Sequence, residues 1–204
     1  MKAISHALGA IVVLGLVMLK AAAADVVGLD PDGYIRDWVM LAPIALPEGG
    51  VAADLILREQ VKDEASLKPR DGEQVTVNGR TLTWKKVTAS TNHFDFNAVL
   101  KTQNDHAAGF LVTYVECDRE MPNVTVSVGS NDQARIYFNG VDIYAFTEAR
   151  PLMLDADKGR VTLKPGLNVI VFKIINEQNS WQGAMRLTDK TGAPLSEVKI
   201  RRSP

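Results

Sequence analysis

The chain has few of the residues that mark enzymes, metal sites and disulfide-linked domains. Its 204 residues include one cysteine and three histidines, and aromatic residues make up 6% of the sequence. There is no nucleophile elbow, no phosphate-binding glycine loop and no HExxH or CxxC spacing. The sequence therefore lacks the usual signatures of hydrolases, nucleotide-binding enzymes and zinc proteins, and we expect a protein that is not an enzyme.

The histidines leave one catalytic alternative open. His93 and Asp95 share a face of an extended segment, and Asp105 and His106 form a second pair. A zinc site or an unrecognised hydrolase needs both pairs to meet in one cleft. Exposed loop histidines explain the same residues, and this explanation is favoured.

Charge and cysteine content narrow the classes further. The 23 basic and 24 acidic residues give a formal net charge of −1, which does not favour nucleic acid as a partner. A lone cysteine, Cys117, excludes an internal disulfide, so core burial must hold the fold together. Leu111 and Val115 precede Cys117 at even spacing, which indicates a buried strand; an intermolecular disulfide is the alternative.

The first 24 residues have the pattern of a signal peptide. Lys2 precedes an apolar run over residues 3–19, and residues 21–24 are four alanines. Because a run of 17 residues barely spans a bilayer, cleavage after Ala24 is favoured over an uncleaved anchor. We expect an exported protein, periplasmic or extracellular, without stable membrane insertion. The remaining residues 25–204 carry 21 basic and 24 acidic side chains, and their length suits a single domain with its core at about 33–200.

Strand patterns with clear turn chemistry fill the rest of the chain. Apolar residues alternate from Val126 to Phe138, and Asn139-Gly140 then supplies the positive φ angles of a type I′ hairpin turn. We predict a second hairpin over residues 160–176, which turns at Pro165-Gly166. Its second strand is an apolar run in which Lys173 is the only charge, as in a buried strand of a sandwich.

Other segments complete the pattern. Residues 51–61 have apolar positions at helical spacing, which predicts a short helix or an irregular crossing, and the charged residues 62–72 predict a solvated loop. Asn78-Gly79 predicts another hairpin, and residues 109–117 form a strand that is apolar on both faces. About eight such strands without a long helix predict an all-β fold, an antiparallel jelly-roll sandwich of two sheets.

Several motifs stand in the order found in a known family. They are Gly129-Ser130-Asn131-Asp132-Gln133; Asn139-Gly140; Leu163, Gly166 and Asn168; Gly33-Tyr34-Ile35-Arg36-Asp37-Trp38 with Ala42-Pro43-Ile44; Thr83-Trp84-Lys85-Lys86-Val87; and the closing residues 181–195 with Asp189, Gly192, Pro194 and Leu195. From about residue 33 to about residue 200 the chain resembles the galactose-binding-domain-like jelly rolls of secreted bacterial proteins. It departs from them where Asn131 and Gln133 replace aspartate and glycine, and where Ala42-Pro43-Ile44 replaces glycine-proline-phenylalanine.

Candidate ligand-binding residues cluster around two loops. Asn131 and Asp132 offer oxygens to sugar hydroxyls, and an aromatic ring would stack on the sugar. Trp181 follows a polar stretch and is one candidate ring, although packing at the start of the closing strand is favoured for it. Tyr144 is the other candidate, and Arg135 beside the same turn is a candidate donor.

The resemblance also implies a candidate structural calcium, because related jelly rolls often hold one beside the sheet. Calcium takes six to eight oxygen ligands. Asp30, Asp32, Asp155 and Asp157 are the candidate ligands, although turn capping explains each of them separately. No cofactor is required.

The resemblance implies an exported, non-catalytic module that binds a glycan or an envelope or extracellular partner. Members of this fold usually accompany larger secreted proteins as accessory domains. The alternative is a structural or assembly component of an envelope complex. An exposed apolar patch without an aromatic platform would favour that alternative.

Overall fold

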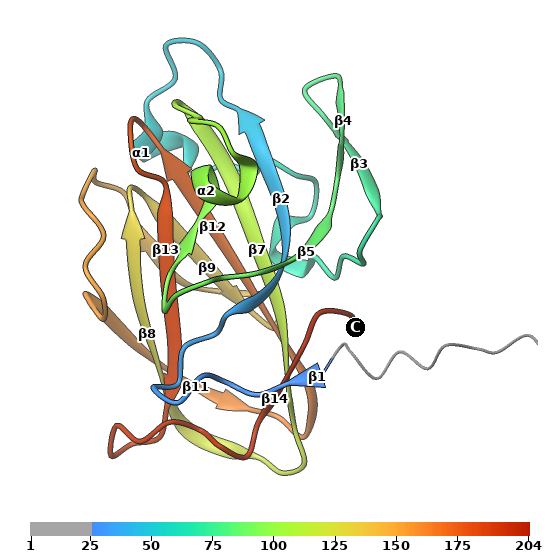
Figure 1. The fold of residues 1–204 in the computed structure, drawn as a ribbon, viewed down its shortest axis with the longest axis vertical. Helices are drawn as coiled ribbons and strands as arrows, with labels where there is room; N and C mark the ends of the chain where they lie inside the picture. The colour runs from blue at the N-terminus through green and yellow to red at the C-terminus, as the bar shows by residue number, and fades with distance from the viewer. Residues whose placement is uncertain (1–25) are drawn as a thin grey trace, which may run out of the picture.

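The computed structural model describes residues 26–204, and the predicted signal peptide at residues 1–24 lies outside the described residues. Two antiparallel sheets face each other in these residues, which confirms the predicted all-β sandwich (Figure 1). In this part of the chain, none of the helices has both the length and the apolar composition needed to cross a membrane.

The larger sheet is built around one long strand. Its strands are β1 (Val26–Val27), β14 (Lys199–Arg201), β7 (Ala107–Cys117), β12 (Gly166–Asn176), β9 (Ala134–Phe138) and β10 (Val141–Phe146), with β2 (Asp37–Ala45) and β5 (Lys85–Thr88) beside them. β12 pairs with β7 along its full length, while β2 and β14 share the opposite edge of β7. β10 forms the far edge of the sheet.

The smaller sheet and the remaining elements cover the first sheet on its two faces. The smaller sheet has the order β11 (Asp157–Leu163), β8 (Met121–Asn131), β13 (Gln182–Thr188) and β6 (Phe94–Asp95). A separate hairpin joins β3 (Gln74–Val77) to β4 (Arg80–Thr83), and the short helical segments are α1 (Ala52–Leu55), η2 (Glu64–Ser66) and α2 (Phe96–Leu100).

Both faces of the larger sheet are buried. Leu111 and Phe172 point into the core between the two sheets. Phe110 and Val171, one position away on the same strands, point into a second core on the outer face. This arrangement confirms the prediction that the strand apolar on both faces is central, since period-two alternation places neighbouring side chains on opposite faces.

The second core is closed by the segment between β2 and β5. A short helix lies where one was predicted, and Leu55 of α1 is buried against the sheet. The prediction of a solvated loop at residues 62–72 is wrong in part: Glu64 is 0% exposed, and the carbonyl of buried Pro69 accepts a 2.7 Å hydrogen bond from the Tyr114 hydroxyl. Charge and proline content indicate a loop, but they do not indicate that the loop packs over the outer face of the larger sheet.

The predicted turns have mixed outcomes. The Asn139-Gly140 turn has φ values of 51° and 83° and joins β9 to β10, so that hairpin is confirmed, as is the hairpin at Asn78-Gly79. The hairpin predicted over residues 160–176 is wrong, because β11 pairs with β8 in the smaller sheet whereas β12 pairs with β7 and β9 in the larger one. Pro165-Gly166 therefore carries the chain from one sheet to the other.

Gly140→Val is expected to lower the free energy of unfolding by roughly 1–3 kcal/mol, because a β-branched residue is strained at positive φ. Gly159→Val is the matched control, since Gly159 lies in β11 and a Cβ there meets nothing within 4 Å. Urea denaturation of both variants checks the prediction. Equal stability of the two variants would contradict the turn's proposed role.

Candidate binding site

One end of the sandwich is formed by a corner between the two sheets. β8 ends at Asn131 in the smaller sheet, and β9 begins at Ala134 in the larger one. The Asp132 amide donates to the Ile175 carbonyl at 2.9 Å, and Asn131 lies opposite Gln182 at the start of β13. We call this end, at the top of Figure 1 where β8 ends and β13 begins, the polar end; it comprises residues 131–133, residues 176–182 and residues 97–105.

Asp132 ties the corner to two neighbouring segments. Its carboxylate accepts hydrogen bonds from the backbone amide of Glu177 at 2.8 Å and from that of Arg150 at 3.3 Å. Burial raises the pKa of Asp132, although these two amide bonds oppose the change. The residue is 8% exposed, so Asp132 holds the loops in place and presents little surface to a ligand.

Arg150 is the centre of a cluster beside this corner. Its guanidinium contacts the Asp157 carboxylate at 2.6 Å, the Ser130 hydroxyl at 2.9 Å and the Tyr144 hydroxyl at 3.0 Å. It also lies 3.7 Å above the centre of the Phe146 ring. These contacts hold the guanidinium in one orientation between the two sheets.

The Tyr144 and Asp157 side chains are coupled. Burial raises the pKa of Tyr144, and the 2.6 Å hydrogen bond that its hydroxyl donates to Asp157 raises it further. Burial would also raise the pKa of Asp157, but the hydrogen bonds from Tyr144 and Arg150 outweigh burial and hold this pKa below its usual value. At neutral pH the cluster therefore contains a neutral phenol, a carboxylate and a guanidinium.

Buried polar atoms at the polar end have no hydrogen-bond partner within residues 26–204. They are Oδ1 of Asn131, Oε1 of Gln133, Oδ1 of Asn176 and Nε1 of Trp181. Gln133 and Asn176 are 1% and 0% exposed. A buried polar group left unpaired costs about 1–3 kcal/mol, so such groups usually face an ordered water, an ion or a ligand. Three of the four atoms are acceptors, which suits a donor such as a hydroxyl or a water.

Amide side chains continue from these buried atoms to the surface. Asn97 donates to the Asn179 carbonyl at 2.8 Å, and Asn176 donates to the Asn104 carbonyl at 2.6 Å, so these amides join the loops to one another. Gln178 is exposed and Gln182 half-buried. A primary amide both donates and accepts hydrogen bonds, as a sugar hydroxyl does. The polar end can therefore exchange hydrogen bonds with a hydroxyl-rich molecule.

The structure brings three of the predicted ligand-binding residues together. Asn131, Asp132 and Tyr144 all contribute to the corner or to the Arg150 cluster. The exposed position considered for Trp181 is wrong, because its ring is 0% exposed and stacks on Phe96 at 4.2 Å with an angle of 14°; the packing alternative is correct.

Arg135 does not belong to this site. It lies on the outer face of the larger sheet, 5.0 Å above the Tyr137 ring. There its guanidinium pairs with Asp142 at 2.7 Å. Neighbouring side chains of β9 point to opposite faces of the larger sheet. Ala134 points into the core between the sheets, so Arg135, the next residue, points to the outer face and away from the corner.

The four candidate calcium ligands do not form one site. Asp155 pairs with Arg186 and Asp157 with Arg150, so an arginine occupies the place beside each carboxylate. Asp30 caps its own turn by accepting from the amides of Asp32 and Tyr34, as the turn-capping alternative predicts. Within residues 26–204, no three His, Cys, Asp or Glu side chains gather in a way that could hold a metal ion.

The two histidines make separate local contacts. Nδ1 of His93 lies 3.2 Å from the Thr91 hydroxyl, and Nε2 of His106 lies 3.1 Å from the Pro47 carbonyl. The gathering that a hydrolase or zinc site requires is not found in the described part of the chain. Ser130 makes no nucleophile either, because its hydroxyl donates to the Asp132 carbonyl at 2.7 Å and not to a base.

No family model matches this sequence, and no curated protein matches it. Among solved structures, the chain is similar to the PA14 domain of the antifreeze protein MpAFP, with 11% identity and a TM-score of 0.39 over 60% of this chain. It spans 59% of the length of that domain. It is also similar to the PA14 sugar-binding domain from an RTX adhesin, with 13% identity and a TM-score of 0.42 over 83% of this chain and 100% of the adhesin domain. Likenesses of this size identify no ligand for the present chain.

Proposed function

We propose that the protein is a non-catalytic binding module of the galactose-binding-domain-like type, and that its polar end binds a glycan. The observation that supports this function is the set of buried amide oxygens without partners, on Asn131, Gln133 and Asn176, behind a rim of exposed amides. An ordered water can donate a hydrogen bond to such a buried oxygen and form a second hydrogen bond with a ligand hydroxyl.

Binding at this end would depend on hydrogen bonds and not on stacking. Trp38, Trp84 and Trp181 are at most 2% exposed, and the hydroxyl of half-buried Tyr144 is already used by Asp157. Without a free aromatic face, the contribution of ring stacking is lost. We therefore expect weak binding that is selective for the arrangement of hydroxyl groups.

A glycan array probed with residues 25–204 tests the proposal, and a repeat with chelator shows whether calcium contributes. For a glycan that binds, Gln178→Ala and Gln182→Ala are each expected to weaken binding roughly fivefold, the equivalent of one hydrogen bond of about 1 kcal/mol. Calorimetric titration measures the change. Gln74→Ala is the matched control, because Gln74 is an exposed glutamine on β3, outside the polar end.

Gln178→Ala and Gln74→Ala should leave the melting temperature unchanged, since both side chains are exposed. Gln182→Ala should lower it slightly, because it removes the 3.1 Å hydrogen bond that Gln182 donates to Asp95. An array without any bound glycan would contradict the proposal. So would an equal loss of affinity in Gln74→Ala, because that result would place binding elsewhere or make it non-specific.

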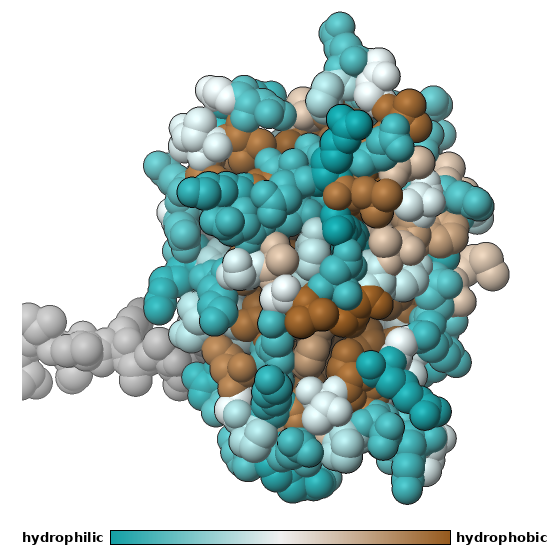
Figure 2. Space-filling view, turned by 180° about the vertical axis from the view of Figure 1, so that it is seen from behind, coloured by the Kyte–Doolittle hydropathy of each residue, from teal (hydrophilic) through white to brown (hydrophobic). Residues whose placement is uncertain are grey.

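A specific observation favours a second function, assembly into an envelope complex. Val141 and Ile143 on β10 are 62% and 37% exposed, and Met153 and Leu154 in the connection to β11 are 61% and 43% exposed. Apolar groups also interrupt the hydrophilic surface at several places on the face seen in Figure 2. β10 is an edge strand, and edge strands can pair with another chain. A negative glycan array together with partner binding that Val141→Lys abolishes would favour this function.

We also propose that the protein is exported. The signal-peptide pattern supports it, and the expected mature protein begins at Asp25. N-terminal sequencing of protein recovered from envelope and culture fractions tests it. Retention of Lys2 in that protein would reverse the proposal.

A further inference from the structure

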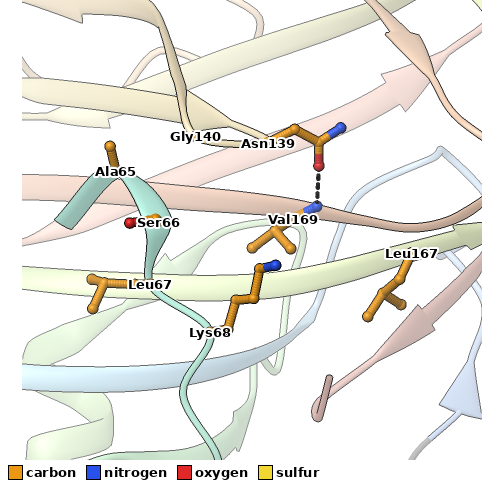
Figure 3. Close-up of a pocket in the computed structure, with 8 residues that line it drawn as sticks. All are labelled: Ala65, Ser66, Leu67, Lys68, Asn139, Gly140, Leu167 and Val169. Atoms are coloured by element: carbon orange, nitrogen blue, oxygen red, sulfur yellow. Dashed lines mark hydrogen bonds between the residues drawn. The ribbon is translucent and has the colours of Figure 1, made fainter. Parts of the chain in front are cut away.

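A small pocket lies on the outer face of the larger sheet, away from the polar end. It has a volume of about 170 Å³ and lies between η2, the β9–β10 turn and the start of β12 (Figure 3). Its lining is Ala65, Ser66, Leu67, Lys68, Asn139, Gly140, Leu167 and Val169. An apolar cavity of about 150 Å³ is known to accommodate benzene, so this pocket has room for an apolar body of about six carbons.

The walls of the pocket are fixed by its surroundings. The Asn139 side chain accepts from the Val169 amide at 2.8 Å and donates to the Asn168 side chain at 2.9 Å. On the opposite side, η2 is anchored through Glu64, whose carboxylate lies 2.6 Å from the Lys173 ammonium. The pocket is therefore preformed, and a ligand would pay little to order it.

Lys68 gives the pocket its charge. No hydrogen bond or ion pair joins the Lys68 ammonium to another residue of the described chain, and Figure 3 shows its side chain extending toward Val169 in the pocket. The other seven lining residues are uncharged. The carboxylate of Glu64, which precedes the lining residue Ala65 in the chain, is already neutralised by Lys173. The charge that complements this lining is thus a single negative one.

We propose that this pocket binds a small monocarboxylate with an apolar body of about six carbons. The apolar body lies against Leu67, Leu167 and Val169, and the carboxylate pairs with Lys68 at the mouth. The Ser66 hydroxyl, which donates to the Asp63 carbonyl at 3.2 Å, keeps its lone pairs for a water between it and the carboxylate. The pocket and the polar end have no residue in common, so variants of one leave the contacts of the other in place.

Benzoate is the probe, with benzamide and benzylammonium as neutral and cationic molecules of similar shape. Titration of the ¹⁵N-labelled protein should shift the amide signals of Gly140, Leu167 and Lys68 with benzoate, more weakly with benzamide and not with benzylammonium. Lys68→Met should weaken benzoate binding roughly fivefold, as for a partly exposed ion pair of about 1 kcal/mol. Lys62→Met is the matched control, because Lys62 is an exposed lysine on the same segment outside the pocket.

Ala65→Leu is a second variant that fills the pocket and keeps Lys68. It should abolish binding of benzoate and benzamide alike, while the unchanged signals of the β7 amides report an intact sheet. Equal binding of benzoate and benzylammonium, equal effects of Lys68→Met and Lys62→Met, or benzoate shifts confined to other residues would each overturn the proposal. None of these results bears on glycan binding at the polar end.

Discussion

Glu64→Gln is expected to lower the free energy of unfolding by about 3–5 kcal/mol, because it leaves a buried ammonium without its counter-charge. Glu64 and Lys173 are both 0% exposed, and their charged atoms lie 2.6 Å apart. The Tyr137 hydroxyl donates to the same carboxylate oxygen at 2.6 Å, and Lys173 also donates to the Arg58 carbonyl at 2.8 Å. The glutamine keeps an acceptor for these donors but not the negative charge.

The loss should depend on pH in a defined direction. Burial lowers the pKa of Lys173, against the attraction of Glu64 that raises it. In Glu64→Gln that attraction is gone, so the native state binds fewer protons than the unfolded state, and stability rises with pH. The deficit relative to the wild type should therefore shrink as the pH approaches the ordinary lysine pKa of about 10.4. Urea denaturation at several pH values measures it.

Two controls separate the buried charge from other effects. Glu59→Gln changes an exposed carboxylate five residues earlier, and should stay within about 0.5 kcal/mol of the wild type. The double variant Glu64→Leu, Lys173→Met replaces the pair by apolar side chains, and should recover only part of the stability lost in Glu64→Gln, because the buried Tyr137 hydroxyl loses its acceptor. A deficit in Glu64→Gln as small as that of Glu59→Gln would show that water reaches the pair.

This ion pair shows what the sequence can and cannot predict. Lys173 stands out as the one charge in an apolar strand, which predicts a buried position of unusual character. Its partner is 109 residues earlier, in a segment whose charge and proline content predict a solvated loop. No local pattern connects the two, because the contact exists only after the segment between β2 and β5 has folded across the sheet.

The turns, too, could be predicted from the sequence only where the requirement is local. Asn-Gly pairs predict hairpins because the positive φ angles are a local requirement, and both predicted Asn-Gly hairpins are present. Pro165-Gly166 also makes a turn, but its two strands belong to different sheets. Strand alternation defines which face of a strand is buried and does not define the partner strand.

The candidate site was predicted only in part. Asn131 and Asp132 were found through turn chemistry and hydrogen-bonding capacity, and the structure places them at a corner between the sheets. Arg150, the centre of the neighbouring cluster, lies in a connection without periodicity, so no sequence signal distinguished it from a solvated arginine. Its role depends on Asp157 and Ser130, which approach it from two different strands of the smaller sheet.

Trp181→Ala is expected to lower the free energy of unfolding by about 3–5 kcal/mol, as for a large buried aromatic residue replaced by alanine. The Trp181 ring stacks on Phe96, and both rings lie on the backbone of β7 at Gly109. A Cβ at Gly109 would come within 2.7 Å of the Trp181 ring, so the two rings fill the space that glycine leaves. Removing the ring leaves a cavity beside the central strand.

Two further variants, Trp181→Phe and Tyr144→Ala, are compared with Trp181→Ala. Trp181→Phe keeps a stacked ring and should cost less than Trp181→Ala, whereas Tyr144→Ala removes a half-buried ring together with its hydrogen bond to Asp157. Thermal unfolding and glycan titration of all three distinguish packing from recognition. If Trp181→Ala kept its melting temperature and lost glycan binding, the ring would be a stacking platform and its buried position would be wrong. Loss of stability together with retained glycan binding in Trp181→Ala would instead show that the ring packs in the core, and would assign recognition to the amides of the polar end, because the ring is then absent and these amides remain.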